Sequence, residues 1–217
     1  MNEGVTRDYG HFDSYLDRTI QDVYAQPPDA GHTAWARHAV VTMTSILRGA
    51  RTVLDVGCGQ GFLSKLFEGL GYEWTGVTIG EDYDACVEHG LRVDNADMTF
   101  LRYKDKSFDV VFARHVLEHS PFPLLTLMEW RRVCKGWLIL VAPSPGYWGI
   151  RGRNHYSIMN SDQLRWLLSR AGWRVIHRYD FTSADQLAKD HLEGVPDDPA
   201  VIIEYRLLCE QCEPEVT

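Results

Sequence analysis

A glycine-rich stretch that begins at residue 55 carries the clearest chemical signal in the sequence. Asp55 is followed by Gly57, Gly59 and Gly61, with a β-rich run before them and an amphipathic run after them. Glycine adopts positive φ without strain and lets a ligand approach the backbone closely. The helix N-terminus that follows such a turn offers free N–H groups and a partial positive charge. The stretch therefore predicts a strand–turn–helix unit that binds a small ligand through its backbone.

Two nucleotide-binding motifs that use such a turn fit this sequence poorly. In the dinucleotide motif G-x-G-x-x-G/A the third small residue lets the helix pack closely on the strand, but Phe62 stands at that position. A P-loop needs Gly-Lys-Ser/Thr, and no such run follows Gly61. We therefore favour a ligand other than a pyrophosphate and keep a nicotinamide-dependent oxidoreductase as a disfavoured alternative.

The elements that must position this turn alternate between strands and helices. Strands are predicted near residues 53, 75, 92, 110, 139, 175 and 204, with helices between most of them. Regular alternation implies parallel strands with helices on both faces, so we predict a doubly wound α/β sheet. Residues 1–49 are predicted to form N-terminal helices, residues 50–180 the binding core, and residues 181–217 the last strand and a tail.

Length and composition narrow the class of protein further. A chain of 217 residues with 45% hydrophobic residues suits a single globular domain. The formal net charge of −8 argues against a broad phosphate-binding surface, so nucleic acid is a disfavoured partner. No apolar stretch approaches the ~20 residues of a membrane span, and residues 1–8 show no signal-peptide pattern. We therefore expect a cytoplasmic protein without a membrane partner.

Several motifs, in matching order, resemble the class I S-adenosylmethionine-dependent methyltransferases, in particular their small-molecule, type 11-like subgroup. Val53–Leu63 resembles the family's Asp-x-Gly-x-Gly-x-Gly motif, and Ser107–Val111 resembles its Ser-Phe-Asp-x-Val stretch. Val116–His119 resembles the subgroup's x-Leu-Glu-His, and Asn160–Val175 resembles its late leucine-rich segment. The resemblance covers about residues 50–180. It implies a seven-stranded, mostly parallel, Rossmann-like sheet of order 3-2-1-4-5-7-6 with strand 7 antiparallel.

The same resemblance implies S-adenosylmethionine as the cofactor and S-adenosylhomocysteine as its product. Gly57, Cys58 and Gly59 would then place their backbone against the methionine part of the cofactor. Asp55 would lie near the amino end, where a carboxylate complements an ammonium group. The plainer alternative for these residues is an ordinary strand–helix turn with no ligand.

The ribose and adenine parts of the cofactor have their own predicted partners. A carboxylate at the end of strand 2 usually binds the ribose hydroxyls, but Thr78 occupies that position. We predict that Thr78 binds the ribose with Glu81 or Asp82, although these acids could instead only begin a helix. Asp97 is predicted to accept a hydrogen bond from the adenine amino group, or else to occupy an exposed turn. Met98 is predicted to offer its backbone and an apolar contact.

The reacting centre is predicted after strand 4, where ligands meet in open α/β sheets. Arg114 and His115 stand there, and one of their backbones is predicted to face the sulfonium. Methyl transfer needs alignment above all, but a general base helps when the acceptor is a hydroxyl or an ammonium group. We predict His115 and His155 as pocket residues able to act as that base, with His119 and Tyr156 as alternatives. His119 could equally hold the loop in place.

No metal is predicted, although Glu118, His119 and His155 could form a site with histidine and carboxylate ligands and are kept as an alternative. Cys209 and Cys212 form an isolated CxxC near the end of the chain, whereas a structural zinc site usually needs two such pairs. The five cysteines are scattered and odd in number, so they indicate no disulfide framework. We expect the CxxC thiols to be inert.

The acceptor is predicted to be a small molecule methylated at oxygen, nitrogen or carbon. Ala113–Val116 stands where the amino-DNA methyltransferases carry Asn/Asp-Pro-Pro-Tyr/Phe, and the Pro-Cys nucleophile of the cytosine-C5 class is missing. Basic residues are the local exception to the negative charge, and part of this cluster could bind an acidic or phosphorylated acceptor. They are Arg131, Arg132, Lys135, Arg151 and Arg153.

A helix over Tyr9–Val23 is predicted to act either as a lid that excludes water from the cleft or simply as a helix packed on the sheet. Two functions remain as alternatives to a small-molecule methyltransferase. One is a catalytically inactive partner subunit that binds S-adenosylmethionine, and the other is a nucleic-acid or protein methyltransferase.

Overall fold

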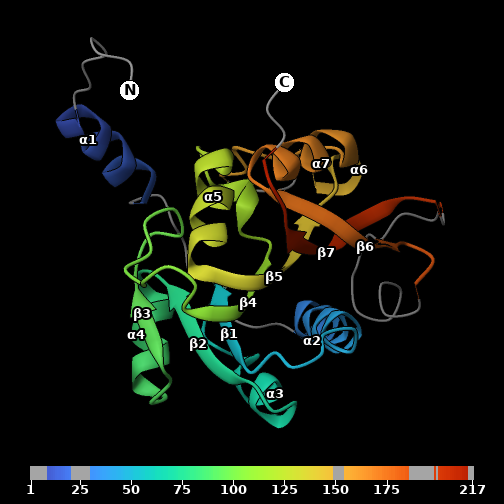
Figure 1. The fold of residues 1–217 in the computed structure, drawn as a ribbon, viewed down its shortest axis with the longest axis horizontal. Helices are drawn as coiled ribbons and strands as arrows, with labels where there is room; N and C mark the ends of the chain where they lie inside the picture. The colour runs from blue at the N-terminus through green and yellow to red at the C-terminus, as the bar shows by residue number, and fades with distance from the viewer. Residues whose placement is uncertain (1–8, 21–29, 149–153, 186–197, 199, 215–217) are drawn as a thin grey trace.

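The computed structural model describes residues 9–20, 30–148, 154–185, 198 and 200–214. Its centre is a single seven-stranded sheet (Figure 1). The strands are β1 Thr52–Val56, β2 Glu73–Thr78, β3 Val93–Asn95, β4 Phe108–Arg114, β5 Cys134–Pro143, β6 Trp173–Thr182 and β7 Ile202–Gln211. They lie in the order β3-β2-β1-β4-β5-β7-β6, and β7 alone runs antiparallel to its neighbours. The predicted fold class and strand order are therefore confirmed.

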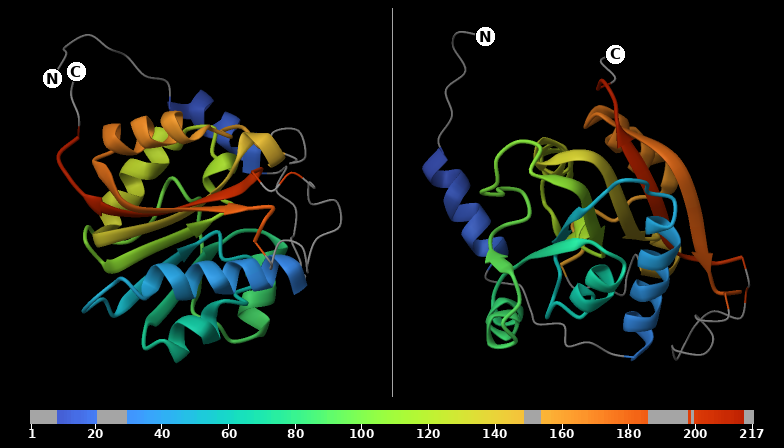
Figure 2. Two further views of the ribbon diagram at one scale, coloured as in Figure 1. Left: turned by 90° about the vertical axis from the view of Figure 1, so that its right-hand side faces the viewer. Right: turned by 60° about the horizontal axis from the view of Figure 1, so that its bottom comes forward.

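Helices cover both faces of this sheet (Figure 2, left). One face carries α2 Ala30–Thr44, α3 Ser64–Gly69 and α4 Glu81–Glu88, and the other carries α5 Pro123–Val133 and α7 Ser161–Arg170. Alternate residues of a strand point to opposite faces, so neighbouring strand residues belong to different apolar clusters. Strands covered on both faces are apolar along their length, which accounts for the continuous apolar run in β5.

Short irregular elements follow the carboxyl ends of β4 and β5. A 3-10 turn, η1 Leu117–His119, comes after β4, and the one-turn helix α6 Pro145–Trp148 comes after β5. Further along, α7 begins at a capping box in which Asn160 accepts from two backbone N–H groups and the side chain of Gln163 accepts from the Asn160 N–H. This cap fixes the point where the segment 154–160 enters α7.

Helix α1 Tyr9–Ile20 lies close to the start of α5 (Figure 1). Phe12 contacts the rings of Phe100 and Phe122, with centroid distances of 6.2 and 5.2 Å. The lid role of this helix stays a prediction, and residues 21–23 of its predicted span lie outside the described residues. No helix in the described part of the chain combines the length and apolar character needed to cross a bilayer.

Candidate active site

The glycine turn after β1 has the conformation that its sequence predicts. Gly57, Gly59 and Gly61 have φ of 67°, 54° and 74°, a region that glycine enters without strain. The N–H groups of Gly57 and Cys58 donate to the carbonyl of Val77 at 2.8 and 3.1 Å, which ties the turn to β2. A Cβ at Gly57 would lie 2.2 Å from Cγ2 of Val116, so a larger residue does not fit there.

A cavity lies at the carboxyl ends of β1, β2 and β4, the usual position of ligands in open α/β sheets. The predicted site residues in its wall are Gly57, Gly59, Thr78, Asp82, Met98 and His115, together with the alternatives His119 and Tyr156. Val77, Ile79, Ala96, Val116 and Asn154 complete the wall that the structure describes. The turn, the end of β2 and the start of η1 therefore enclose one space.

The other predicted site residues lie around this cavity and outside the part of its wall that the structure describes. They are Asp55, Cys58, Glu81, Asp97, Arg114 and His155. Asp55 is buried and accepts a hydrogen bond from the indole N–H of Trp74 at 3.0 Å. Burial raises the pKa of Asp55 to about 7, although that hydrogen bond opposes the shift. Asp97 Oδ1 accepts the Thr99 N–H at 2.7 Å, and Glu81 is exposed at the start of α4.

His115 contacts a network of ionisable side chains from β4, β7 and α2. Nε2 of His115 and Nη2 of Arg114 lie 3.0 and 3.3 Å from Oε2 of Glu204. The other oxygen of Glu204 accepts from Nε of Arg206 at 2.7 Å. Glu204 and Arg206 are fully buried, and Arg206 also contacts Nδ1 of His38. The ring of His115 therefore contacts the carboxylate of Glu204, which is itself paired with the guanidinium groups of Arg114 and Arg206.

Burial and this network together set the protonation of His115. Burial first, and then the neighbouring Arg114, lower the pKa of His115 to about 4, so its ring is neutral near pH 7. Burial alone would raise the pKa of Glu204, but Arg114 and Arg206 hold it well below its usual range. An ionised carboxylate only accepts hydrogen bonds. Nε2 of His115 therefore carries the hydrogen, and Nδ1 is the ring's acceptor atom.

A family model described as a methyltransferase domain matches residues 33–178. The chain belongs to the class I S-adenosylmethionine-dependent methyltransferases. The methyltransferase is 36% identical, over 93 residues, to the ubiquinone biosynthesis O-methyltransferase of Pseudomonas paraeruginosa, a match covering 39% of this chain and 40% of that one. The enzyme of the same name from Erwinia tasmaniensis is 29% identical over 136 residues, or 59% of this chain and 50% of that one. The chain thus spans half or less of these relatives.

Solved structures share the fold of this methyltransferase at low sequence identity. An S-adenosylmethionine-dependent methyltransferase from Archaeoglobus fulgidus has a TM-score of 0.66 at 19% identity, covering 94% of this chain and 100% of that one. The [4+2]-cyclase SpnF has a TM-score of 0.64 at 21% identity, covering 94% and 93%. One fold thus carries different chemistries, so the residues of the site, and not the fold, determine the reaction.

The cavity of the methyltransferase fits its cofactor, S-adenosylmethionine. At Gly57 the absence of a side chain lets Val116 pack directly against the turn, and at Gly59 the nearest atom to a Cβ would be Oδ2 of Asp82 at 4.0 Å, so the backbone of Gly59 stays open toward the cavity that it lines. Hydroxyl and carboxylate groups of Thr78 and Asp82 suit ribose hydroxyls, and Met98 with its apolar neighbours suits an adenine ring. The individual cofactor contacts of these residues and of Asp55, Cys58, Glu81, Asp97 and Arg114 stay predictions.

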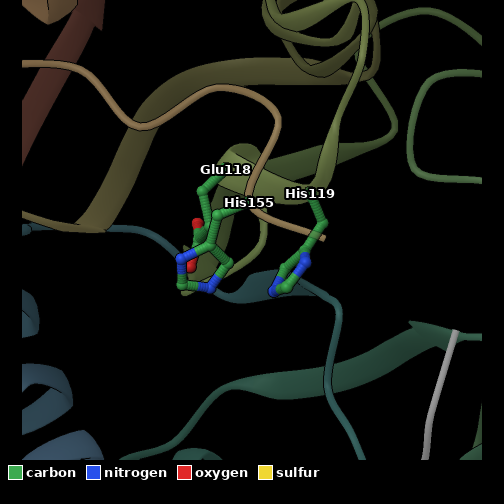
Figure 3. Close-up of side chains that lie close together, drawn as sticks. All are labelled: Glu118, His119 and His155. Atoms are coloured by element: carbon green, nitrogen blue, oxygen red, sulfur yellow. The ribbon is translucent and has the colours of Figure 1, made fainter. Parts of the chain in front are cut away.

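Glu118, His119 and His155 come together beside the cavity, with their polar ends turned toward one another (Figure 3). One potential ligand atom from each residue lies within 4.8 Å of the other two. The rings of His119 and His155 meet at a centroid distance of 4.9 Å. Burial raises the pKa of Glu118 to about 8, and burial followed by the proximity of His155 lowers that of His119 to about 4.

Two partners of the site residues, Glu204 and Trp74, are not predicted from the sequence. Glu204 is 89 residues from His115 and reaches it because β7 pairs with β5, which sets Glu204 opposite Pro143. The available signal was two charged residues, Glu204 and Arg206, within the mostly apolar run 201–209. Trp74 offered none, because an aromatic residue is common in any strand.

The predicted basic cluster divides into two parts. Arg151 and Arg153 lie outside the described residues. Arg131, Arg132 and Lys135 lie near the amino end of β5, whereas the cavity is at the carboxyl ends of the strands. Their partners are the carbonyl of Cys212, Glu129 and Asp109, in that order. This second part therefore stabilises the far end of the sheet and does not reach the cavity.

Proposed function

We propose that this methyltransferase transfers the methyl group of S-adenosylmethionine to a small organic acceptor, with His115 as the base that takes the acceptor's proton. A hydroxyl oxygen is the favoured acceptor atom, and nitrogen or carbon are the alternatives. The observation that carries the proposal is the hydrogen bond between His115, in the cavity wall, and the fully buried Glu204.

The cofactor supplies an electrophilic methyl group on a sulfonium, so the protein has to supply alignment and removal of a proton. His115 is suited to the second task because its ring is neutral near pH 7 and its Nε2–H is directed at Glu204. Nδ1 is then the atom that accepts the proton. The charge of Glu204 offsets part of the destabilisation that burial and Arg114 impose on the imidazolium that forms, as in histidine–carboxylate pairs of other enzymes.

The ring of His115 is positioned by its backbone as well as by Glu204. His115 has φ of 52°, which is uncommon for a residue other than glycine, and its N–H donates to the carbonyl of Val141 at 2.9 Å. Such conformations persist only where the surroundings enforce them and are frequent at functional sites. This backbone strain supports a functional role for His115 independently of its charge environment.

Two relatives support oxygen as the acceptor atom. Both are named ubiquinone biosynthesis O-methyltransferases, and the matches cover 39% and 59% of this chain. The net charge of −8 and the engagement of Arg131, Arg132 and Lys135 at the far end of the sheet disfavour a nucleic-acid acceptor.

Transfer of a labelled methyl group into a panel of phenols, amines and carbon acids tests this proposal. We expect incorporation into a hydroxyl-bearing acceptor. Cofactor binding by calorimetry without transfer to any member of the panel would instead support a cofactor-binding subunit that lacks catalysis.

With the acceptor known, Glu204→Gln tests the role of His115. We expect kcat to fall roughly 10²-fold or more, with the Kd of S-adenosylmethionine almost unchanged, because Glu204 acts through the His115 ring. Glu210→Gln, which removes the partner of Arg174 further along β7, is the matched control and should leave kcat unchanged. An unaltered kcat in Glu204→Gln would refute the proposed base.

A further inference from the structure

Beside the cavity, Glu118 presents a carboxyl group that the proposed reaction does not use. Glu118 is 2% exposed, and neither of its carboxylate oxygens has a hydrogen-bond partner within the part of the chain that the structure describes. A buried carboxylate without a partner is costly unless it is protonated, paired with a charge or bound to a metal. Its neighbours are the imidazole rings of His119 and His155 (Figure 3).

We propose that Glu118, His119 and His155 bind a divalent transition-metal ion such as Zn²⁺. One ligand atom from each residue lies within 4.8 Å of the others. With bonds of ~2.0 Å, the ligands of a tetrahedral zinc ion lie about 3.3 Å apart, so modest side-chain rotations would close the site. Two imidazoles and one carboxylate favour zinc, cobalt or nickel over calcium and magnesium, which prefer oxygen ligands.

His119 already has the orientation of a metal ligand. Its Nδ1 lies 3.1 Å from the carbonyl oxygen of Asn154, so the ring donates its Nδ1–H there and leaves Nε2 as the ligand atom. Metal-binding histidines characteristically donate their second ring N–H to a carbonyl or a carboxylate, which fixes the tautomer and the ring plane.

The two segments that supply the ligands are held together by their own backbone contacts. The N–H of Ser157 donates to the carbonyl of Glu118 at 2.9 Å, and the hydroxyl of Ser157 donates to the carbonyl of Ser120. The capping box at Asn160 fixes the chain a few residues further on. Glu118 and His155 are thus brought together by the fold, so an ion does not have to assemble the site.

Three protein ligands leave a coordination position for water or for a substrate atom, as in catalytic zinc sites. Because His119 also lines the cofactor cavity, the ion would border the space where an acceptor binds. Metal binding by these three residues does not depend on whether His115 is the base.

Titration of the untagged protein with Co²⁺, followed by visible absorption, tests this proposal. We expect one ion per chain, with d–d bands and without the sulfur-to-cobalt charge-transfer band that a cysteine site would give. Glu118→Gln and His155→Ala should each weaken binding at least about 100-fold, since loss of even an outer-sphere partner costs 10–100-fold. His89→Ala, an exposed histidine in the turn after α4, should have no effect.

Zn²⁺ should also raise the Tm of the wild-type protein and of His89→Ala but not that of Glu118→Gln, and circular dichroism of the metal-free variants establishes that they are folded. Failure of the wild type to bind Co²⁺ or Zn²⁺ would overturn the proposal, as would equal binding by Glu118→Gln and wild type. In either case Glu118 would be a buried acid that stays protonated.

Discussion

The turns after β1 and after β4 border the same cavity but are stabilised in different ways. The turn after β1 depends on three glycines with positive φ within five residues, and its contacts run through the backbone to β2. The turn after β4 contains His115, which also has positive φ and carries a large side chain held by Glu204. The backbone conformation of the first turn is specified by glycines adjacent in the sequence. The charge environment of His115 in the second turn requires a residue from a strand far away in the sequence.

Breaking the charged network should have the largest effect on stability. Arg206→Met removes a fully buried guanidinium from Glu204 and should lower the free energy of unfolding by ~3–5 kcal/mol, because a buried charge loses its partner. Urea unfolding measures this change. Arg92→Met, which breaks a pair whose side chains are 64% exposed, is the control and should cost less than ~1 kcal/mol.

The double variant Glu204→Gln with Arg206→Met sharpens this prediction. It removes both charges and should recover part of the lost stability, because no carboxylate is then left buried beside the missing guanidinium. If Arg206→Met cost no more than Arg92→Met, the buried network would not hold the turn after β4.

A steric change in the glycine turn should weaken the binding of S-adenosylmethionine more than it lowers the stability of the fold. Gly57→Ala introduces a Cβ 2.2 Å from Val116 at a position with φ of 67°, a strain of roughly 2–3 kcal/mol. Because the free protein can relieve this strain by displacing the turn, cofactor binding has to restore it, and calorimetry should show S-adenosylmethionine affinity falling roughly 30–150-fold. Gly69→Ala, at the end of α3 with nothing within 4 Å of its Cβ, should leave affinity unchanged. Wild-type affinity in Gly57→Ala would show that the turn can widen.

The smallest effect should come from pH, through Asp55 behind the glycine turn. The pKa of Asp55 is raised to about 7 by burial, so below that pH it is protonated and no longer complements an ammonium group. Affinity for S-adenosylmethionine should therefore increase as pH rises from about 6 to about 8, by up to about tenfold, and then level off. Calorimetry at several pH values measures this slope. Asp55→Asn should remove it, and a slope that survives in Asp55→Asn would exclude Asp55 as its source.

Much of the fold was predictable because its signals are local. Alternating runs of apolar residues located the strands, and glycines and prolines marked the ends of several helices. The strand order followed from resemblance to a family, and the structure confirms it. The short elements η1 and α6 were not predicted, because three or four residues carry too little periodicity to be recognised.

The candidate site was predictable in part for the same reason. Gly57, Gly59 and Thr78 were named from the turn and the strand end on which they lie, and they do line the cavity. His155 was named from its place in an irregular segment, and the structure sets it beside the cavity with Glu118 and His119. The contacts that orient these groups, such as the Asn154 carbonyl on His119, depend on how two segments pack.

The sequence by itself determined the alternation of strands and helices, the glycine turn and the family, because these depend on residues close together in the chain. Only the tertiary structure decided that Glu204 of β7, itself paired with Arg206, contacts His115, and that Glu118 meets two histidines without a hydrogen bond from the described residues. Electrostatic interactions depend on distance in space and not on separation in the sequence. The pairing of β7 with β5 brings Glu204 to His115, although the two residues are 89 positions apart in the chain.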